Sequence, residues 1–255
     1  MLTVDVIVAS AGSGKRMGAG LNKLLLKLDT KENDSIENKG LTLLEHGLKS
    51  FLDHPKIRTI FLVVSKKDWK QLKPLAVQKG MVLVEGGKRR QDSVHKALLH
   101  IDQYEEPPDI ILIQDGARIF CSRDLIERVI EGAHDKGSAI PVIPLQDTVR
   151  KIKTERGAIN FSKKSIQTTF KEVDIKSEVL DRNELFAVQT PQGFRFKDVL
   201  EASVKSQKEN WEVTDDASLL EKFGKAVHPV RGDSGNLKIT TTEDLAWARW
   251  KFKSA

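Results

Sequence analysis

The sequence predicts an α/β protein built on a doubly wound, mostly parallel sheet. Apolar runs of strand length alternate with segments of helical periodicity along most of the chain. This alternation favours parallel strands joined by right-handed crossovers. A glycine-rich loop follows the first apolar run, and an acidic residue closes the run at residues 109–115. Ligands of such sheets bind beyond the carboxyl ends of the strands, so both features are expected at a binding site.

Composition narrows the classes of protein that this chain can be. Its 255 residues, 39% of them hydrophobic and 31% charged, suit one domain over residues 1–255 with residues 146–185 as an arm. No apolar run approaches the roughly 18 to 20 residues that span a bilayer, and the first residues lack a signal-peptide pattern. We therefore expect a cytoplasmic protein with no membrane partner. A single cysteine, Cys121, excludes an internal disulfide framework.

Strands are expected wherever an apolar run of about six residues lies between turn-forming residues. In chain order, the expected strands are residues 3–9, 59–65, 81–87, 109–115, 138–145 and 226–232. Helices are expected where apolar residues recur at helical spacing. The expected helices are residues 41–52, 67–80, 91–101, 122–137, 197–208, 213–224 and 241–253.

Several helix ends carry capping residues. Ser122 and Gly137 are expected to bound one helix, and Gly80 to end another. Asp92 or Ser93 is the expected N-cap of the helix at 91–101. For the helix at 213–224 we expect Thr214 as the cap, with Asp215 and Asp216 in a structural role at a helix start.

Two segments interrupt the alternation. Residues 29–40 are polar and predict a surface loop. Residues 146–185 interleave β-branched residues with Lys and Glu, which predicts an extended hairpin arm. An isolated strand pair is only marginally stable, so we expect the arm to pack on a second subunit.

The loop after the first strand, "VASAGSGKRMG" at residues 8–18, matches neither of two common phosphate motifs. A Walker A loop needs Gly where Ala9 stands and a hydroxyl where Arg16 stands. A dinucleotide fingerprint needs a third glycine where Met17 stands. Small residues after a strand still let backbone N–H groups approach a triphosphate, and Lys23 adds positive charge. The alternative is a tight turn with incidental surface cations.

Six stretches together carry a family resemblance. These are "AGSGKRM…NK", "EGGKRRQDSV" (85–94), "QDGAR" (114–118), "DRNELFAVQTPQGF" (181–194), "VTDDASLLEKFG" (213–224) and "GNLKITTTEDL" (235–245). In this order the chain resembles the 2-C-methyl-D-erythritol 4-phosphate cytidylyltransferases of the non-mevalonate isoprenoid pathway, from about residue 4 to 250. The resemblance implies a Rossmann-like nucleotidyltransferase fold.

The resemblance also implies a reaction and its partners. CMP would pass from CTP to 2-C-methyl-D-erythritol 4-phosphate, giving 4-diphosphocytidyl-2-C-methyl-D-erythritol and pyrophosphate. Mg²⁺ would be held mainly by the phosphates, with Asp115 as a candidate ligand. The arm at 146–185 would form a homodimer. The attacking phosphate is largely dianionic at neutral pH, so no general base is needed.

The residue roles carried over from the family fall into three groups. The implied catalytic residues are Arg16, Lys23, Arg182 and Lys238. The implied CTP-binding residues are Ser10, Ala11, Gly12, Gly14, Gly87, Ser93 and Gly116. The implied substrate-binding residues are Asp115, Arg118, Thr148, Thr190 and Thr214. Arg90 either braces its loop or meets a phosphate, and Lys238 has the alternative of a solvated strand-end lysine.

Four residues depart from the family's usual ones. Asn22 stands in place of Pro, Leu24 in place of Gln, Gln114 in place of His and Ile119 in place of Pro. None of these changes removes a charge that the chemistry needs.

Three other functions remain open. A ribitol 5-phosphate cytidylyltransferase would share the fold and the loop, but that family tends to have "DSVR" where this chain has "DGAR". A nucleotidyltransferase acting on a sugar 1-phosphate is a wider alternative.

From another class, a net charge of +6 suits a nucleic-acid-binding protein, an enzyme of anionic metabolites, or merely a lysine-rich surface. Aromatic residues are only 6%, with no RRM, KH or helix-turn-helix pattern, so no nucleic-acid partner is expected.

Overall fold

The computed structural model describes residues 2–12, 22–28, 40–153, 159–160, 169–170 and 176–253. The chain forms two compact units. The first consists of Met1–Val142 and Val188–Ala255, and the second of Ile143–Ala187. The predicted arm, residues 146–185, falls within the second unit. All but one of the residues of the predicted loop at 29–40 lie outside the described ones.

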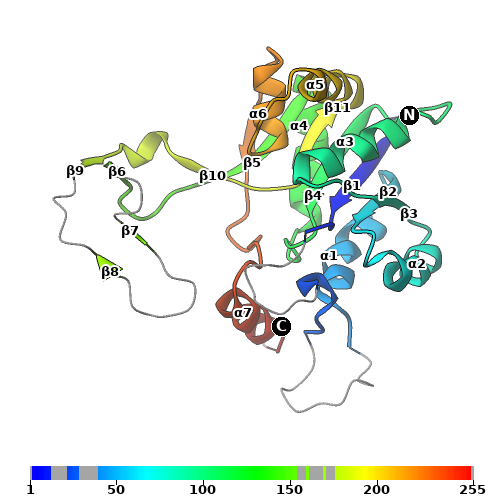
Figure 1. The fold of residues 1–255 in the computed structure, drawn as a ribbon, viewed down its shortest axis with the longest axis horizontal. Helices are drawn as coiled ribbons and strands as arrows, with labels where there is room; N and C mark the ends of the chain where they lie inside the picture. Colours follow the sequence, from blue (N-terminus) through cyan, green and yellow to red (C-terminus); the bar gives the residue numbers. More distant parts are fainter. Residues whose placement is uncertain are drawn as a thin grey trace. The chain divides into compact units, whose positions relative to one another are not determined.

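The described strands and helices follow the predicted alternation (Figure 1). The strands are β1 (Val4–Ala9), β2 (Ile57–Val64), β3 (Val82–Glu85), β4 (Ile110–Asp115), β5 (Ser138–Pro144), β6 (Arg150–Lys153), β7 (Ile159–Asn160), β8 (Thr169–Phe170), β9 (Lys176–Val179), β10 (Phe186–Val188), β11 (Gln192–Arg195) and β12 (Pro229–Arg231). The helices are α1 (Leu43–Leu52), α2 (Trp69–Gln78), α3 (Arg90–Ile101), α4 (Arg123–Lys136), α5 (Phe196–Lys208), α6 (Asp216–Lys222) and α7 (Thr242–Lys253), with short 3₁₀ turns η2 (Lys23–Leu25) and η3 (Arg182–Glu184).

The main sheet has the strand order β10-β5-β11-β4-β1-β2-β3, and β12 pairs with β5. Strand β1 runs parallel to both β2 and β4, and β2 runs parallel to β3. Strand β11 is antiparallel to β4 and β5. The chain therefore winds from β1 outward to β3 and then returns to the other side of β1 to form β4. This confirms the predicted α/β class with a mostly parallel, doubly wound sheet.

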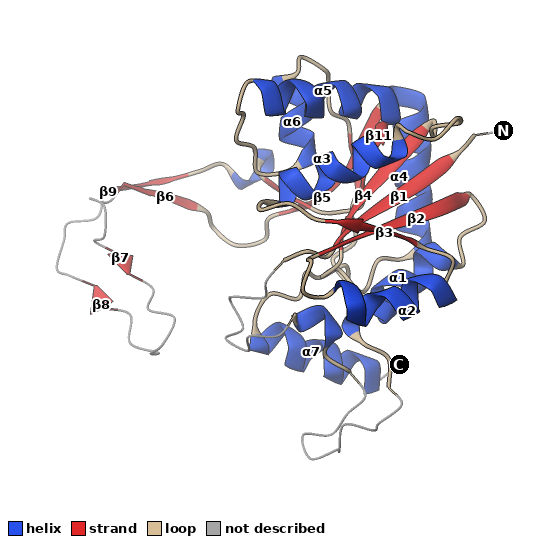
Figure 2. Cartoon of the chain, turned by 45° about the vertical axis from the view of Figure 1, so that its right-hand side comes forward, coloured by secondary structure: helices blue, strands red, loops and turns tan. Residues whose placement is uncertain are grey.

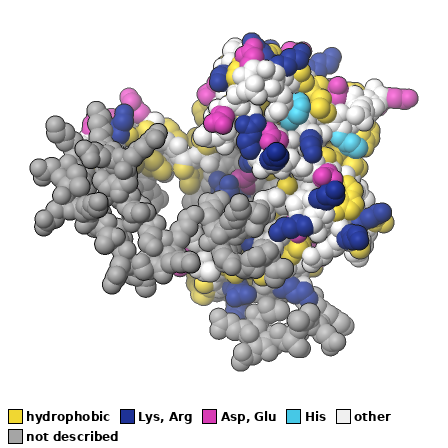
Figure 3. Space-filling view, in the orientation of Figure 1, with side chains coloured by type: hydrophobic (Ala, Val, Ile, Leu, Met, Phe, Trp, Pro, Cys, Tyr) yellow, Lys and Arg dark blue, Asp and Glu magenta, His cyan; other side chains and the backbone are white. Residues whose placement is uncertain are grey.

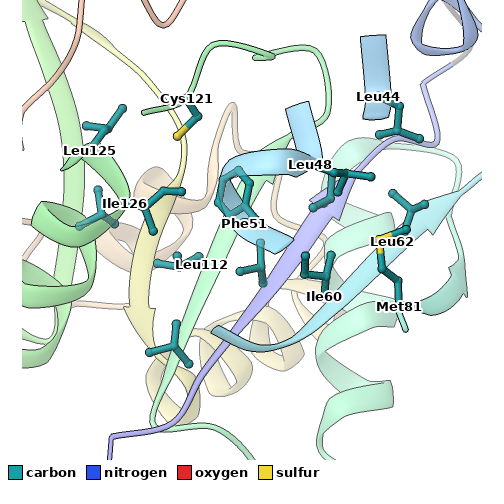
Figure 4. Packing of buried hydrophobic residues seen from close by; sticks show 14 of the residues in the cluster. Leu44, Leu48, Phe51, Ile60, Leu62, Met81, Leu112, Cys121, Leu125 and Ile126 are labelled. Atoms are coloured by element: carbon teal, nitrogen blue, oxygen red, sulfur yellow. The ribbon is translucent and has the colours of Figure 1, made fainter. Parts of the chain in front are cut away.

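Both faces of the sheet are covered by helices (Figure 2). Along β1, Val6 and Val8 belong to one buried cluster and Ile7 to the other. The first cluster takes apolar residues from α1, α2 and α4, and the second from α3, α5 and α6. Figure 4 shows Phe51 of α1 and Leu112 of β4 within the first cluster. Burial on both faces explains why the strands are continuous apolar runs.

Helix ends agree with the predictions at α4. The Ser122 hydroxyl accepts the N–H of Leu125 at 3.3 Å, and Gly137 ends the helix with φ of +87°. The predicted caps of α3 were wrong. That helix begins at Arg90, and Arg89 is its N-cap. Asp92 lies inside the first turn, where its carboxylate accepts the N–H of Arg89 at 3.1 Å.

The predicted cap of α6 was also wrong. Asp215, not Thr214, is the N-cap, and its carboxylate accepts the N–H of Ser218 at 2.9 Å. A carboxylate at a helix start gains from both the hydrogen bond and the helix dipole, so it competes well with a neighbouring hydroxyl. The helix then begins at Asp216.

The second unit contains the predicted hairpin. Strands β6 and β9 pair antiparallel, with Ile152 opposite Ser177 and Arg150 opposite Val179. Strands β7 and β8 form a further antiparallel pair. In the part of the chain that the structure describes, no helix combines the length and apolar character needed to cross a membrane.

Neighbouring leucines of α3 test how the packing stabilises the fold. Leu98 is fully buried in the second cluster, whereas 39% of Leu99 is exposed. Leu98→Ala is expected to lower the free energy of unfolding by about 2–5 kcal/mol, because it leaves a cavity. Leu99→Ala makes the same change on the surface and should cost less than about 1 kcal/mol. Urea unfolding of both variants measures this, and equal losses would contradict the assigned packing.

Candidate active site

The carboxyl ends of β1 and β4 meet at the point where the winding of the sheet reverses. Ala9 is the register partner of Asp115, and the N–H of Gly116 donates to the Ala9 carbonyl at 3.1 Å. The next residue after β1, Ser10, donates its N–H to Val63 of β2 at 2.9 Å. A cavity of about 430 Å³ lies at this edge. In open α/β sheets, ligands bind at the point where the strand order reverses.

Many of the predicted site residues line this cavity. They are Ser10, Ala11, Gly12, Lys23, Gly87, Ser93, Asp115, Gly116 and Lys238. Sequence reasoning assigned no site role to Asn22, Lys88 and Thr240, which also line it, and left Arg90 undecided. Lys88 and Arg90 belong to the stretch "EGGKRRQDSV" and follow Gly87 closely in the sequence. Their closeness to a predicted CTP-binding residue was the sequence signal that could have placed them in the site.

Other predicted residues are placed elsewhere. Arg118, Thr190 and Thr214 belong to the first unit but not to the lining of this cavity. Thr214 lines a second cavity of about 280 Å³. Thr148 and Arg182 belong to the second unit, where Arg182 donates to the Gln146 carbonyl at 2.9 Å. Gly14 and Arg16 lie outside the described residues. The binding roles of all these residues remain predictions.

Two glycines allow close packing around the cavity. A Cβ on Gly116 would lie 2.4 Å from the Ser10 hydroxyl, and one on Gly87 would lie 2.4 Å from the Asp92 Cβ. The Ser10 hydroxyl itself is buried and has no hydrogen-bond partner among the described residues. A buried hydroxyl normally has a partner, so this group is suited to binding a ligand in the cavity.

Ser93 shapes the loop before α3. Its hydroxyl accepts the N–H of Gly87 at 3.0 Å and donates to the Arg89 carbonyl at 3.0 Å. Only 3% of Ser93 is exposed. The hydroxyl therefore fixes the backbone of the loop that faces the cavity.

Lys23 lies at the start of η2, and Asn22 fixes that start. The side-chain Oδ1 of Asn22 accepts the N–H of Leu24 at 3.1 Å, and its Nδ2 donates to the Asp68 carboxylate at 3.0 Å. The Lys23 ammonium donates to the carbonyl of Ile239, the residue that follows Lys238. Lys23 and Lys238, two of the lysines that line the cavity, are thus linked through one loop.

Four charged side chains form a continuous chain of ion pairs. Lys238 Nζ lies 2.6 Å from Asp115 Oδ2, and Arg90 Nε lies 2.9 Å from Asp115 Oδ1. Arg90 Nη1 lies 2.7 Å from Asp216 Oδ2. Burial would raise the pKa of Asp115, but Arg90 and Lys238 outweigh it and lower this pKa to about 2. The carboxylate is therefore ionised at neutral pH.

Comparisons with known proteins identify the family. The model of the family described as 2-C-methyl-D-erythritol 4-phosphate cytidylyltransferase matches residues 4–254. The chain belongs to this family. A relative with that name from Bacillus cytotoxicus is 34% identical over 244 residues, which cover 94% of this chain and 93% of the relative. These findings confirm the resemblance noted in the sequence.

Solved structures of the family have the same fold. The 4-diphosphocytidyl-2C-methyl-D-erythritol synthase from Anaerococcus prevotii aligns with a TM-score of 0.75 at 25% identity, covering 99% of this chain and 96% of its own. The 2-C-methyl-D-erythritol 4-phosphate cytidylyltransferase from Francisella tularensis aligns with a TM-score of 0.74 at 28% identity, covering 98% and 99%.

The departures from the family's usual residues are accommodated by local contacts. Leu24 and Ile119 are buried in apolar clusters, at 5% exposure each. Gln114 accepts the Thr190 hydroxyl at 2.8 Å, and this hydroxyl in turn accepts the N–H of Asp115 at 3.0 Å. Together with the hydrogen bonds of Asn22, these contacts hold the four residues in place near the strand ends.

Arg118 braces the loop that carries Lys238. Its guanidinium donates to the Asn236 carbonyl at 2.7 Å and to the Val188 carbonyl at 3.3 Å. The Asn236 amide donates to the Thr190 carbonyl at 2.8 Å. Arg118, Asn236 and Thr190 thus fix the position of the loop relative to the end of β4.

Within the described residues, acids, histidines and cysteines form no group of three or more that could hold a metal ion. Both oxygens of Asp115 already pair with cations. A magnesium ion in this cavity would therefore take most of its oxygen ligands from a bound triphosphate, with Asp115 as the protein carboxylate within the lining.

The depressed pKa of Asp115 predicts an acid-dependent stability. A carboxyl group with a lowered folded-state pKa stabilises the fold above about pH 4, and this contribution is lost as the pH falls toward 2. From the ordinary value of 3.8 to about 2, the contribution is about 2 kcal/mol. Unfolding of Asp115→Asn followed between pH 5 and pH 2 should therefore show a flatter loss of stability than the unmodified protein.

The exposed Asp135 on α4 offers a matched control. Its side chain is 71% exposed, so Asp135→Asn should keep the acid dependence of the unmodified protein. An Asp115→Asn variant with unchanged acid dependence would contradict the ion-pair assignment.

Proposed function

We propose that this chain transfers CMP from CTP to 2-C-methyl-D-erythritol 4-phosphate, releasing pyrophosphate. One observation carries the proposal: in a member of the cytidylyltransferase family, the cavity between β1 and β4 gathers Ser10, Lys23, Asp115 and Lys238. These groups offer positive charge and hydrogen bonds to two phosphorylated substrates.

The chemistry requires two anions to meet. An oxygen of the polyol phosphate attacks the α-phosphorus of CTP, and the bond to the β-phosphate oxygen breaks as pyrophosphate leaves. The attacking phosphate monoester has a second pKa near 6, so no proton has to be removed. The main barrier is electrostatic, and fixed positive charge around the reacting phosphorus lowers it.

Each element at the cavity has a role in this reaction. The backbone N–H groups of Ala11 and Gly12 and the Ser10 hydroxyl bind CTP phosphates. Lys23, together with the predicted Arg16, stabilises the charge that develops at the α-phosphorus. Lys238 orients the attacking phosphate, and Asp115 accepts hydrogen bonds from polyol hydroxyls.

The loop before α3 selects the base. Its shape depends on Gly87, which packs against Asp92, and on the two hydrogen bonds of Ser93. Such a loop can offer backbone groups to a pyrimidine and exclude the larger purines by size. Purine triphosphates used as well as CTP would contradict this role.

Magnesium belongs to the proposal as a cofactor. Bound to the triphosphate, it would neutralise charge on the leaving pyrophosphate. The triphosphate would supply most of the ligands of the magnesium ion, and the Asp115 carboxylate in the cavity lining would be the candidate protein ligand.

We further propose a homodimer formed through the arm. On the β6–β9 hairpin, 46% of Ile152 and 54% of Val179 are exposed, and their register positions lie on one face of the strand pair. A second copy would cover these two apolar side chains. Thr148 and Arg182 would then complete the neighbouring site. We place the enzyme in the cytoplasm, as expected from the sequence.

The alternative substrates make different demands. In the "DSVR" pattern of ribitol 5-phosphate cytidylyltransferases a serine takes the place of Gly116, whose added Cβ would here lie 2.4 Å from the Ser10 hydroxyl. This supports methylerythritol phosphate as the substrate.

Figure 3 shows Lys and Arg interspersed with Asp and Glu on the described part of one face, rather than in the continuous basic stripe typical of nucleic-acid binding.

Product analysis tests the function. The purified chain is incubated with CTP, Mg²⁺ and either 2-C-methyl-D-erythritol 4-phosphate or ribitol 5-phosphate, and the nucleotide product is identified by mass. We expect the diphosphocytidyl product from the first substrate alone.

Lys23→Ala should lower turnover by about 10²- to 10³-fold, because it removes one preorganised charge.

The matched control is Lys136→Ala, which removes an exposed lysine at the end of α4. This variant should turn over like the unmodified enzyme. Product from ribitol 5-phosphate alone would favour the alternative substrate, and normal turnover by Lys23→Ala would remove that residue from catalysis.

A further inference from the structure

The ion-pair chain at the cavity has two unlike ends. The Lys238 side chain is 39% exposed, whereas that of Asp216 is only 4% exposed. A lysine ammonium on a flexible stem can exchange one anionic partner for another at low cost. A buried carboxylate cannot lose its partner without a large penalty. The lysine end is therefore exchangeable, and the aspartate end is fixed.

Arg90 connects these two ends. Its Nε faces Asp115 and its Nη1 faces Asp216. Its remaining nitrogen, Nη2, is buried and has no hydrogen-bond partner among the residues that the structure describes. The two paired nitrogens hold Asp115 and Asp216 at once. Of the two roles left open by the sequence, these contacts favour bracing.

Substrate binding creates a conflict at Asp115. Under the proposed function, Lys238 binds the attacking phosphate, yet its ammonium lies 2.6 Å from Asp115 Oδ2. A phosphate that attracts this lysine approaches an ionised carboxylate. Like charges at such a distance repel strongly in a partly buried site. A second cation on the carboxylate is needed while the lysine serves the phosphate.

We propose that Arg90, anchored by Asp216, is a positioning residue that holds and neutralises Asp115 while Lys238 moves to the substrate phosphate. This role rests on the proposed function and adds a residue pair to it. Asp216 lies at the first position of α6 and Arg90 at the first position of α3. Both helix starts are thereby tied to the end of β4, where the polyol binds.

The planar fork of an arginine is essential to this role. It places two nitrogens on two separate carboxylates at 2.9 and 2.7 Å. A lysine carries a single point charge and cannot reproduce that geometry. Arg90→Lys is therefore expected to behave like loss of the anchor, although it keeps the charge.

Steady-state kinetics of Asp216→Asn in the full-length protein test the proposal. We expect KM for the polyol phosphate to rise on the order of tenfold, since the carboxylate that meets the polyol loses its fixed orientation. KM for CTP should stay within about twofold, because the CTP phosphates are bound by other groups. Arg90→Lys should show the same selective change, which provides a second variant if Asp216→Asn does not fold.

An ion pair of another buried aspartate, away from the cavity lining, provides the control. Asp5 of β1 is fully buried and pairs with Arg58 at 2.6 Å. Asp5→Asn makes the same substitution at another buried, ion-paired aspartate, so it should lower the melting temperature and leave both KM values unchanged. All assays are run below the melting temperature of every variant.

A double-variant cycle separates positioning from general destabilisation. If Asp216 acts through Asp115, adding Asp216→Asn to Asp115→Asn should cause little further rise in KM for the polyol phosphate. Additive effects would overturn the proposal. An equal rise in both KM values, or no selective rise in Asp216→Asn and Arg90→Lys, would overturn it as well.

The unmodified enzyme separates this proposal from the function on which it rests. If it forms product and the variants show no selective change in KM, only the positioning role fails. If it forms no product from any polyol phosphate, the proposed function fails and the positioning role fails with it.

Discussion

The carboxylate of Asp115, held between Lys238 and Arg90, is the interaction on which the site depends. It sits at the end of β4, next to the first residues of the loop after β1. Two cations keep it ionised, with a pKa of about 2 in spite of its burial. One of those cations comes from the start of α3 and the other from the loop before α7, so a single side chain links three parts of the first unit.

The surrounding scaffold serves to place this carboxylate and its cations. The hydroxyl of Thr190 accepts the N–H of Asp115, and Arg118 and Asn236 fix the loop that carries Lys238. Close packing at Gly116 brings this strand end against Ser10. The result is a cavity in which Asp115 and Arg90 are held in place before substrates arrive, while Lys238 can exchange its partner. Preorganisation of this kind is the main means by which an enzyme can join two anions without a general base.

Much of this arrangement could be predicted from the sequence, because apolar periodicity and small residues after a strand reflect local physics. The fold class and most of the residues placed around the cavity came from such patterns together with the family resemblance. The predicted N-cap of α6 was wrong because Thr214 and Asp215 are both good capping residues, and only the path of the backbone decides between them. The role of Arg90 stayed open for a different reason. Its partners lie 25 and 126 positions away, and no spacing rule relates residues so distant.

The central claim is that the positive charge gathered in this cavity contacts the phosphates of both substrates. A crystal structure of the chain with a non-hydrolysable CTP analogue and the polyol phosphate tests it most directly. The account predicts Lys23 and Lys238 within hydrogen-bond distance of phosphate oxygens, with Asp115 still paired to Arg90. Lys23 turned to bulk solvent, with Lys238 remaining on Asp115, would contradict it.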